Sequence, residues 1–547
     1  LTASRELELT LTGRDCGLPE RAPMCGVPYH AVDTYITRLI EKGYRVAICE
    51  QMEDPALAKG LVKREITRIV TPGTVTDQSA LSERQNNFLA SVCIEGKRAG
   101  LAYTDVTTGE FYVRQLSNEE RELRGALAAI APREIITNAP DTVHPLSEAS
   151  IGSCPQTAFR GANASDMLCE HFGVNSLTAL GLDATLLPAA HAAGALMRYL
   201  SETQKNAMTH ITALRILSEN QTMPLDAATR RNLELTEGLH SRTTRGSLLW
   251  LLDKTATAMG GRLLRRWVEQ PLLSRAAIEQ RLNAVSALYD NHVLSERLYD
   301  ILRNVYDMER ILSKVSYNTL NARDCLALLR SLKQVPPLQA LLADDACAPV
   351  CAALGELDPL SGLAQLLENA INPDAPLQIT EGAVIREGYN AQLDELRQAT
   401  TQGKQWLSDL EAKEREETGI KTLRIQYNRV FGYYIEVTKS YYNLVPLRYQ
   451  RRQTLASSER FTTDELRQIE SKITGAQEQS TRLELELFYA IRSEIAAAMP
   501  RLQGTANALK TLDALLSLAR VARENNYVRP TLTDDGTLTI HDGRHPV

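Results

Sequence analysis

The fold of this chain is best read from the stretch Lys421-Thr-Leu-Arg-Ile-Gln-Tyr-Asn428 and its continuation Gly432-Tyr-Tyr-Ile-Glu-Val-Thr438. Apolar and polar residues alternate in both segments, which is the pattern of a β-strand with one buried face. The intervening Arg-Val-Phe breaks the alternation, so we expect two strands of a small sheet. One face would be apolar, and the other would carry Arg, Lys, Gln, Asn and Thr side chains.

The stretch from residue 421 to residue 460 is basic, although the protein as a whole is acidic. It holds eight Lys and Arg residues, two Glu and six Tyr, whereas the 547-residue chain has a formal net charge of −6. Charges on a hairpin usually mean only a solvated face. Because charge, aromatic rings and amides coincide here, we instead predict a surface that contacts a phosphate backbone. The candidate contact residues are Lys421, Arg424, Asn428, Arg429, Lys439, Arg451, Arg452 and Gln453.

Both flanks of this stretch are predicted to be long helices. Residues 389–417 are rich in Leu, Gln, Glu, Lys and Ala and contain no Pro. After the stretch, apolar residues recur at spacings of three and four, which predicts a helix packed along a neighbour. Thr462-x-x-Glu465 has the pattern of a capping box at its start. The predicted seam residues are Leu466, Ile469, Ile473, Ala476, Ser480, Leu483, Leu487 and Ala490.

Composition and motifs exclude several function classes. The sequence has no apolar run of membrane-spanning length and no signal peptide, so we expect a protein without a membrane segment. Its nine cysteines include no Cys-x-x-Cys pair, so we expect reduced thiols and no metal site. No Gly-x-x-x-x-Gly-Lys-Ser/Thr loop occurs, so we expect no cofactor, no catalytic residue and no ATP hydrolysis in this segment.

The rest of the chain predicts two smaller α/β regions followed by helices. Residues 1–75 have the pattern of a small α/β unit. Residues 87–138 predict three strands, a helix and a strand, an order compatible with a ribonuclease-H-like domain. Such a fold can be a nuclease, but Asp105 and Glu110 are more readily explained as ordinary exposed carboxylates than as metal ligands. From about residue 189 the chain is predicted to be almost wholly helical, with Arg262, Arg265 and Arg266 solvated or paired.

Several stretches, in this order, resemble the MutS family of DNA mismatch repair proteins. The resemblance covers nearly the whole chain and suggests an internal fragment, because the family's Phe-x-Glu motif and its P-loop would fall outside residues 1–547. It adds Tyr29 and His30 as tentative DNA contacts. The stretches include Pro23-Met-Cys-Gly-Val-Pro-Tyr-His-Ala31, Arg68-Ile-Val-Thr-Pro-Gly-Thr74, Phe431-Gly-Tyr-Tyr-Ile435, Tyr449-x-Arg-Arg-Gln-Thr-Leu455 and Gly543-Arg-His-Pro546.

The resemblance implies a multidomain α+β fold that is mainly helical. It has a small α/β remnant, a ribonuclease-H-like connector, and a long helical core and lever domain with an inserted β-rich clamp. The implied domains are 1–75, the rear of the mismatch-binding domain; 76–205, the connector; 206–417, core and lever helices; 418–462, the clamp; 463–525, returning lever helices; and 526–547, the start of an ATPase domain.

The resemblance also implies the function and partners of the intact protein. These are binding of duplex DNA with mismatches or small loops, ATP and Mg²⁺ in an ATPase domain, a homodimer, a MutL-type partner and a cytoplasmic, nucleoid-associated location. Three alternatives stay open: a MutS-like paralogue that binds branched or recombination DNA, a ribonuclease-H-like nuclease, and a helical scaffold whose basic tip binds an acidic protein. The region 1–75 argues against the paralogue.

Overall fold

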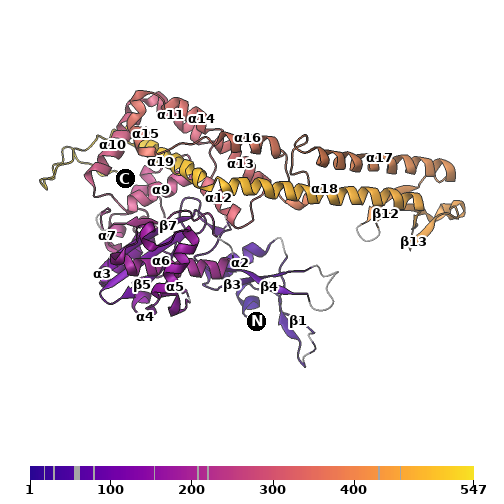
Figure 1. Ribbon diagram of the computed structural model, residues 1–547, viewed down its shortest axis with the longest axis horizontal. Helices are drawn as coiled ribbons and strands as arrows, with labels where there is room; N and C mark the ends of the chain where they lie inside the picture. Colours follow the sequence, from indigo (N-terminus) through magenta and orange to yellow (C-terminus); the bar gives the residue numbers. More distant parts are fainter. Residues whose placement is uncertain are drawn as a thin grey trace. The chain divides into compact units, whose positions relative to one another are not determined.

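The computed structural model describes residues 1–547 except 16, 18, 29–30, 54–61, 78–79, 153, 206–207, 219–220, 429–431 and 456. The fold mixes α and β structure and is mainly helical (Figure 1). The chain divides into two compact units. The first comprises residues 1–320, 330–361 and 496–547, and the second comprises residues 321–329 and 362–495.

The first unit begins with two small hairpins and two helices. The strands β1 (Thr12–Arg14) and β2 (Ala22–Met24) pair antiparallel, as do β3 (Val46–Gln51) and β4 (Arg64–Val70). Helix α1 spans Thr2–Glu6, and α2 spans Val32–Glu41. Their core is small, because the buried cluster among the described residues of this region consists of Ile40, Val70 and Val75. The α/β pattern predicted for residues 1–75 is thus confirmed for its described part.

A six-stranded sheet follows, with the strand order β10-β7-β6-β5-β8-β9. The strands β5, β6 and β7 pair antiparallel, whereas β8, β9 and β10 join the sheet in parallel. Helix α6 (Leu187–Gln204) packs on one face and α3 (Glu120–Ile130) on the other. The strands are β5 (Leu89–Glu95), β6 (Arg98–Asp105), β7 (Glu110–Ser117), β8 (Glu134–Thr137), β9 (Ser150–Gly152) and β10 (Arg215–Leu217).

Small residues let α6 lie close to this sheet. Five of its buried residues are alanines, and a Cβ at Gly100 of β6 would lie 2.0 Å from the Pro188 carbonyl oxygen. Only glycine fits at that position because the helix backbone occupies the space. The buried face of the sheet and the buried stripe of the helix therefore form one core. The short helices α4 (Pro140–Val143) and α5 (Gly161–Phe172) complete this region.

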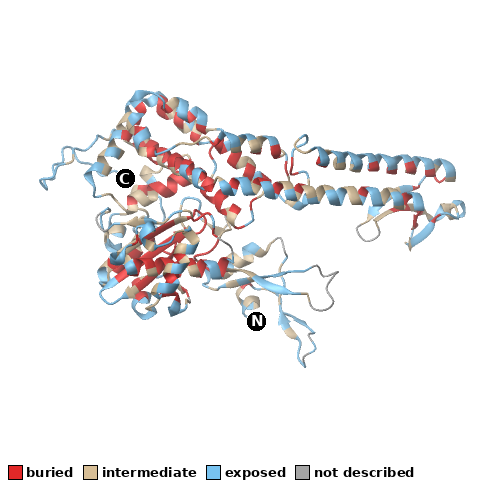
Figure 2. Cartoon of the chain, in the orientation of Figure 1, coloured by how far each residue is buried: buried red, intermediate tan, exposed pale blue. Residues whose placement is uncertain are grey.

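The remainder of the first unit is helical and surrounds α19 (Met499–Glu524), in which fifteen residues are buried (Figure 2). Helices α8 to α12 and α15 pack against it. Their bounds are α7 Ala227–Asn232, α8 Leu248–Leu252, α9 Ala258–Glu269, α10 Arg275–Asp290, α11 His292–Leu302, α12 Met308–Ser316, α14 Val335–Leu342 and α15 Ala348–Leu354. The sequence segments Val528–Thr533 and Leu538–His541, separated by Asp534-Asp-Gly536, predict a hairpin, but residues 526–547 form no strand, so this prediction is wrong. An isolated two-stranded hairpin is at best marginally stable.

The second unit consists mainly of two long helices and a four-stranded sheet (Figure 1). Helix α17 spans Ala391–Thr418, and α18 begins at Asp464 and ends at Ala497. The N-terminal cap of α18 lies one residue later than the predicted capping box of Thr462 and Glu465. The Thr463 hydroxyl accepts a hydrogen bond from the Leu466 N–H at 3.1 Å. The helices α13 (Ala322–Leu332) and α16 (Ser361–Ala370) each cross the boundary between the units.

The helix pair is antiparallel and has a thin core. Arg397 of α17 pairs with Glu484 of α18, and further along the pair Lys413 meets Glu465. The predicted seam holds only at its start, where Leu466 and Ile473 are buried. Further on, the buried residues are Glu484, Phe488, Ile491 and Ile495, while Leu483 is half-buried and Ala490 is exposed. A straight helix drifts by about 20° per heptad, so a strict seven-residue repeat loses the contact face.

Candidate nucleic-acid interface

A four-stranded antiparallel sheet of order β11-β12-β14-β13 follows α17 and precedes α18. Its strands are β11 (Arg424–Asn428), β12 (Gly432–Thr438), β13 (Gln450–Thr454) and β14 (Ser458–Thr462). Ile425, Ile435, Val437 and Phe461 lie on one face and pack with apolar residues of both helices. The predicted alternation is therefore confirmed for these four residues. Tyr427 departs from it, because this residue is 59% exposed, and so does Tyr434, which lies on the predicted polar face but is only 4% exposed.

The sheet is fixed to the helices by polar contacts as well as apolar ones. On α17, the Glu411 carboxylate accepts the Ile425 N–H at 2.7 Å, and Arg415 Nε donates to the Leu423 carbonyl at 2.7 Å. On α18, Glu470 accepts the Tyr433 N–H at 3.0 Å. Such contacts satisfy backbone groups at the sheet edge, so the sheet and the helix ends are held together.

A buried carboxylate anchors the opposite part of the sheet region. Glu414 of α17 accepts hydrogen bonds from the Tyr449 hydroxyl at 2.8 Å and from Arg448 Nη2 at 2.7 Å. Burial and the neighbouring Glu414 raise the pKa of the Tyr449 phenol. Arg448 also pairs with Glu417, so its charge is balanced within the chain. Arg448 therefore stabilises the fold and is not a candidate for DNA contact.

Four of the predicted DNA contacts remain exposed and form no ion pair with any part of the chain that the structure describes: Lys421, Arg424, Lys439 and Arg452. Arg424 begins β11 and lies opposite Glu436. The hydroxyls of Thr422 and Thr438 are 3.0 Å apart. Lys421 directly precedes Thr422 and Lys439 directly follows Thr438, so both lysines lie at the same end of the sheet. Positive charge accordingly collects where β11 begins and β12 ends.

Two predicted contacts are engaged within the sheet. The Cα register pairs Arg451 with Phe461 and Gln453 with Arg460, so Arg452 is the extra residue of a β-bulge. Arg451 donates to the Thr454 hydroxyl and to the buried carboxylate of Glu459. The Gln453 amide oxygen accepts from Arg460 at 2.8 Å. Arg451 and Arg424 consequently lie on opposite faces, because Arg451 pairs with Phe461 of the apolar face, whereas Arg424 pairs with Glu436 of the polar face.

The remaining predicted contacts are only partly placed. Asn428 is half-buried at the end of β11, on the same face as Arg424. Arg429, Tyr29 and His30 lie outside the described residues. Sequence reasoning missed Arg460, whose guanidinium carbon lies 4.3 Å from the centre of the Tyr434 ring. The signal was present, because Arg460 and Tyr434 both fall on the polar side of their alternating strands.

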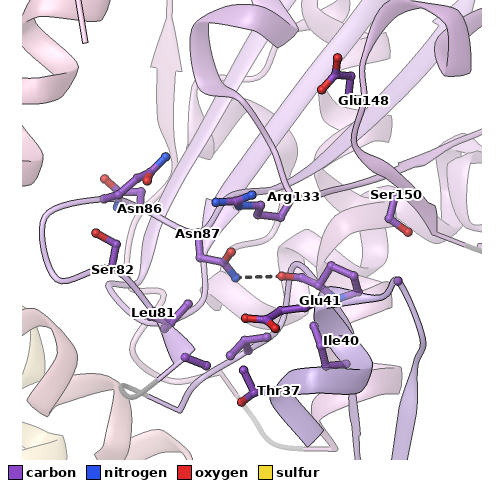
Figure 3. A pocket seen from close by; sticks show the side chains of 15 residues that line it. Thr37, Ile40, Glu41, Leu81, Ser82, Asn86, Asn87, Arg133, Glu148 and Ser150 are labelled. Atoms are coloured by element: carbon purple, nitrogen blue, oxygen red, sulfur yellow. Dashed lines mark hydrogen bonds between the residues drawn. The ribbon is translucent and has the colours of Figure 1, made fainter. Parts of the chain in front are cut away.

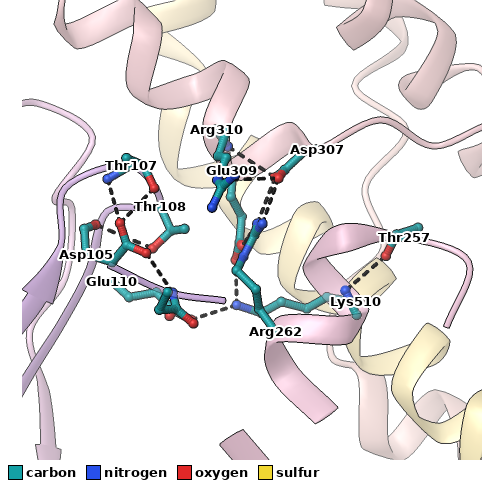
Figure 4. A network of polar contacts seen from close by, with 12 residues as sticks. Asp105, Thr107, Thr108, Glu110, Thr257, Arg262, Asp307, Glu309, Arg310 and Lys510 are labelled. Carbon is teal, nitrogen blue, oxygen red and sulfur yellow. Dashed lines mark hydrogen bonds and ion pairs between the residues drawn. The ribbon is translucent and has the colours of Figure 1, made fainter. Parts of the chain in front are cut away.

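A second group of charges lies in the first unit, with side chains between 3% and 19% exposed. Hydrogen bonds and ion pairs join its members (Figure 4). Arg262 of α9 binds Asp307 through two hydrogen bonds of 2.7 and 2.8 Å and also reaches Glu309 at 2.8 Å. Lys510 of α19 bridges Glu309 at 2.6 Å and Glu110 of β7 at 2.8 Å. Arg266 Nη1 also donates to the Glu110 carboxylate, at 3.0 Å, and is the last member of this row of charges.

This row balances three acids against three bases and joins β7 to α9, α12 and α19. Burial alone would raise the pKa of Glu110, but Arg266 and Lys510 lower it well below its usual value. Arg262 was expected to be solvated or paired; it is paired and only 3% exposed. A buried, fully paired set of this kind specifies how elements fit together more than it adds stability.

The carboxylates considered for a nuclease are also buried, so their predicted exposure is wrong. Asp105 is inaccessible and accepts hydrogen bonds from the backbone of Asn87 and Thr107 and from two side chains. Glu110 lies opposite it but is bound to Arg266 and Lys510. Asp105 thus accepts four hydrogen bonds, and the charge of Glu110 is paired with two cations, so both carboxylates already have partners within the chain.

A polar cavity of about 420 Å³ lies between α2 and the segments around residues 80–87 and 133–150 (Figure 3). Arg133 lines it together with the carboxylates of Glu41 and Glu148. Asn87 donates to the Pro72 carbonyl at 3.0 Å and closes one side. This cavity has mixed charge, so it suits a phosphate-rich ligand less well than the basic sheet does.

Comparison with known proteins extends over the same regions. The sequence matches MutS domain I over residues 1–79, MutS domain II over residues 87–212 and MutS domain III over residues 228–519. The last match includes the basic sheet and both long helices. The chain belongs to the MutS family. Curated MutS proteins agree with this assignment along the whole chain.

Three of these relatives are called DNA mismatch repair protein MutS. The one from Ruminiclostridium cellulolyticum is 46% identical over all of this chain and 63% of its own length. Those from Lachnoclostridium phytofermentans and Pelotomaculum thermopropionicum are 45% and 47% identical, again over all of this chain, and are covered to 59% and 64% of their length. The chain thus spans about three fifths of the MutS relatives it matches. None of its described helices is both long and apolar enough to cross a lipid bilayer.

Proposed function

We propose that this chain is the DNA-contacting and signal-transmitting part of a MutS-type mismatch repair protein, which binds mismatched duplex DNA. The observation that carries the proposal is a set of exposed cations on a sheet that is hydrogen-bonded to two long helices. These cations, Lys421, Arg424, Lys439 and Arg452, form no ion pair with the residues that the structure describes. Cations without an internal partner are available to phosphates, and each phosphate contact releases counterions. Membership in the MutS family supports the same function.

The finer organisation is part of this proposal. Residues 1–75 would be the rear of a mismatch-binding domain, and 76–205 a ribonuclease-H-like connector. Residues 206–417 and 463–525 would be core and lever helices around a clamp at 418–462. Residues 526–547 would open an ATPase domain. The sheet with a helix on each face and the matches to MutS domains I to III support this division.

The clamp is the proposed site of backbone contact. Arg424 and Lys439 would meet phosphates directly, with Lys421 and Arg452 beside them. Arg451 and Gln453 would act indirectly, because they hold Glu459 and Arg460 in place. Phosphate contacts fix position and carry no sequence information, so the clamp would bind duplexes of unrelated sequence alike.

The intact protein would couple this contact to ATP hydrolysis. The hydrogen bonds that join the sheet to α17 and α18 support a role for these helices as levers. Such a role requires that the helix pair adopt two different arrangements. We assign ATP and Mg²⁺ to the part of longer relatives outside this match, since no phosphate-cradling lysine loop occurs in residues 1–547. A homodimer, a MutL-type partner and a cytoplasmic location complete the proposal.

Two double variants of equal charge change test the proposed contact. Arg424→Ala/Lys439→Ala removes two cations of the sheet. Lys404→Ala/Arg482→Ala removes two exposed cations of α17 and α18, with Lys404 about 20 Å along the helix from its sheet end. Fluorescence anisotropy with two unrelated duplexes should show weaker binding for the first variant on both, and parental binding for the second.

Four outcomes would contradict the proposal. Equal losses in both variants would mean that net charge, and not this surface, governs binding. Unchanged binding in both would mean that the sheet is only solvated. Tighter binding to an acidic protein than to either duplex would favour the scaffold alternative. Cleavage of DNA with Mg²⁺ or Mn²⁺ that Asp105→Asn abolishes would favour the nuclease.

A further inference from the structure

Three side chains with metal-binding chemistry converge beside the six-stranded sheet. His191 Nδ1 lies 2.6 Å from Glu95 Oε1, and Cys93 Sγ lies 3.7 Å from the same oxygen. All three ligand atoms lie within 4.8 Å of one another. Within the described part of the chain, this is the one cluster of His, Cys, Asp and Glu side chains that converges in this way.

The fold explains why these residues meet although 96 positions separate Glu95 from His191. Cys93 and Glu95 are alternate residues of β5, so their side chains point to the same face. That face packs against α6, because Leu89 and Cys93 share a buried cluster with its alanines. His191 lies in the first turns of α6 and therefore faces the end of β5. No spacing motif could reveal this set, which is why the sequence predicted no metal site.

The orientation of the imidazole is fixed from the other side. A Cβ at Gly161, the first residue of α5, would lie 3.1 Å from His191 Nε2. Glycine at this position leaves room for the ring edge, and Nδ1 is thereby turned toward Glu95. A metal-ligating histidine needs one ring nitrogen directed at the ion and the ring held in place.

We propose that Cys93, Glu95 and His191 form a binding site for a thiophilic divalent cation of the Zn²⁺ class. A thiolate, an imidazole and a carboxylate are the donor types that zinc accepts, whereas Mg²⁺ and Ca²⁺ require oxygen ligands. The three donors would leave one position of a tetrahedron open. Cys93 is inaccessible, while the Glu95 side chain is 40% exposed, so the open position lies toward solvent and water fills it.

Binding changes the protonation of the cluster in a defined way. The Cys93 thiol, which now points at the Glu95 carboxylate, releases its proton and binds as thiolate. His191 binds through Nδ1 and carries its proton on Nε2. The hydrogen bond of 2.6 Å between His191 and Glu95 is replaced by two bonds to the ion. The ion would tie the end of β5 to α6 and stabilise the region matched as MutS domain II.

The test uses the whole chain stripped of metal with a chelator. Zn²⁺ is titrated in competition with a chromophoric chelator, and Co²⁺ is added separately because a cobalt–thiolate bond gives a near-ultraviolet charge-transfer band. The parent should bind one Zn²⁺ that Cys93→Ser, Glu95→Gln and His191→Gln each weaken by at least the 10–100-fold typical of lost outer-shell partners. Cys49→Ser, at an exposed cysteine of β3, is the matched control and should bind as the parent does.

The conservative variants keep the test decisive. Glu95→Gln and His191→Gln alter partly exposed side chains, so circular dichroism should show a folded chain even if Cys93→Ser does not fold. Zinc uptake unaffected by these variants, absence of the cobalt–thiolate band, or no tightly bound zinc in the parent would each overturn the proposal. These results are independent of DNA binding, which should persist in all metal-site variants.

Discussion

Ile473 of α18 occupies the space that Gly403 of α17 leaves open. A Cβ at residue 403 would lie 2.3 Å from Ile473 Cγ1. The two backbones approach closely there, and the pairs Arg397–Glu484 and Lys413–Glu465 lie on either side of this contact. Because few other residues are buried along these helices, this small contact fixes their register (Figure 2).

Replacing Gly403 by alanine should therefore destabilise the helix pair. Alanine favours a helix over glycine by about 1 kcal/mol, but overpacking against Ile473 costs about 1–3 kcal/mol. Gly475→Ala is the matched control, since a Cβ at Gly475 of α18 meets nothing within 4 Å. Urea unfolding should show loss of stability for Gly403→Ala and a gain of up to about 1 kcal/mol for Gly475→Ala. Stabilisation of both would show that the helices do not meet at Ile473.

The buried Glu484 should matter more than its neighbour Leu483. Glu484 is 3% exposed and accepts from Arg397 at 2.6 Å and from the Val384 N–H at 3.0 Å. Glu484→Ala leaves the Val384 N–H without its acceptor and removes the nearest carboxylate from Arg397, which keeps the Asp394 carboxylate at 3.7 Å, and should cost about 3–5 kcal/mol. Leu483→Ala, at a half-buried site, should cost less than about 2 kcal/mol. If thermal unfolding shows a larger loss of stability for Leu483→Ala than for Glu484→Ala, the predicted heptad seam through Leu483 would be supported instead.

Removing Lys510 should destabilise the joint between β7 and the helices around α19. Lys510→Met leaves Glu110 and Glu309 buried with fewer cationic partners, which should cost about 3–5 kcal/mol. Adding Glu309→Gln should recover part of that loss, because one of the two buried charges is then removed. Denaturation of the single and double variants measures this. Additive losses would argue that the two residues act independently.

His210 should make stability depend on pH. Its Nε2–H donates to the Val106 carbonyl at 2.8 Å, and burial lowers its pKa from 6.5 to about 4. Between these values the unfolded chain binds a proton that the folded chain does not, so stability is present above pH 6.5 and falls as the pH falls toward 4. The loss should approach about 3 kcal/mol. His210→Gln should flatten this part of the profile, whereas His240→Gln, at an exposed histidine, should not. Parallel profiles for His210→Gln and the parent would contradict this role.

The sequence predicted the features that follow from local periodicity. The alternation around Ile425 and Ile435 correctly predicted the apolar face of the sheet, and the Leu-rich flanks predicted the long helices. The cations Arg424 and Lys439 were identified as exposed candidates on the same grounds. Their role in DNA contact stays a prediction.

Features set by long-range packing could not be predicted. The bulge at Arg452 depends on pairing with the neighbouring strand, and helix drift places the buried position at Glu484 and not at the predicted Leu483. Asp105 is buried because backbone donors surround it, which no single strand pattern indicates. Likewise, Cys93 meets His191 only because α6 crosses the end of β5.

The most direct test of the central claim is the salt dependence of duplex binding by the parent, Arg424→Ala and Lys404→Ala. If Arg424 neutralises a phosphate, its loss should reduce the slope of log affinity against log salt by about 0.9 and weaken binding alike on two unrelated duplexes. Lys404→Ala should leave slope and affinity at parental values. An unchanged slope for Arg424→Ala, or a loss confined to one duplex, would contradict a clamp that grips the DNA backbone.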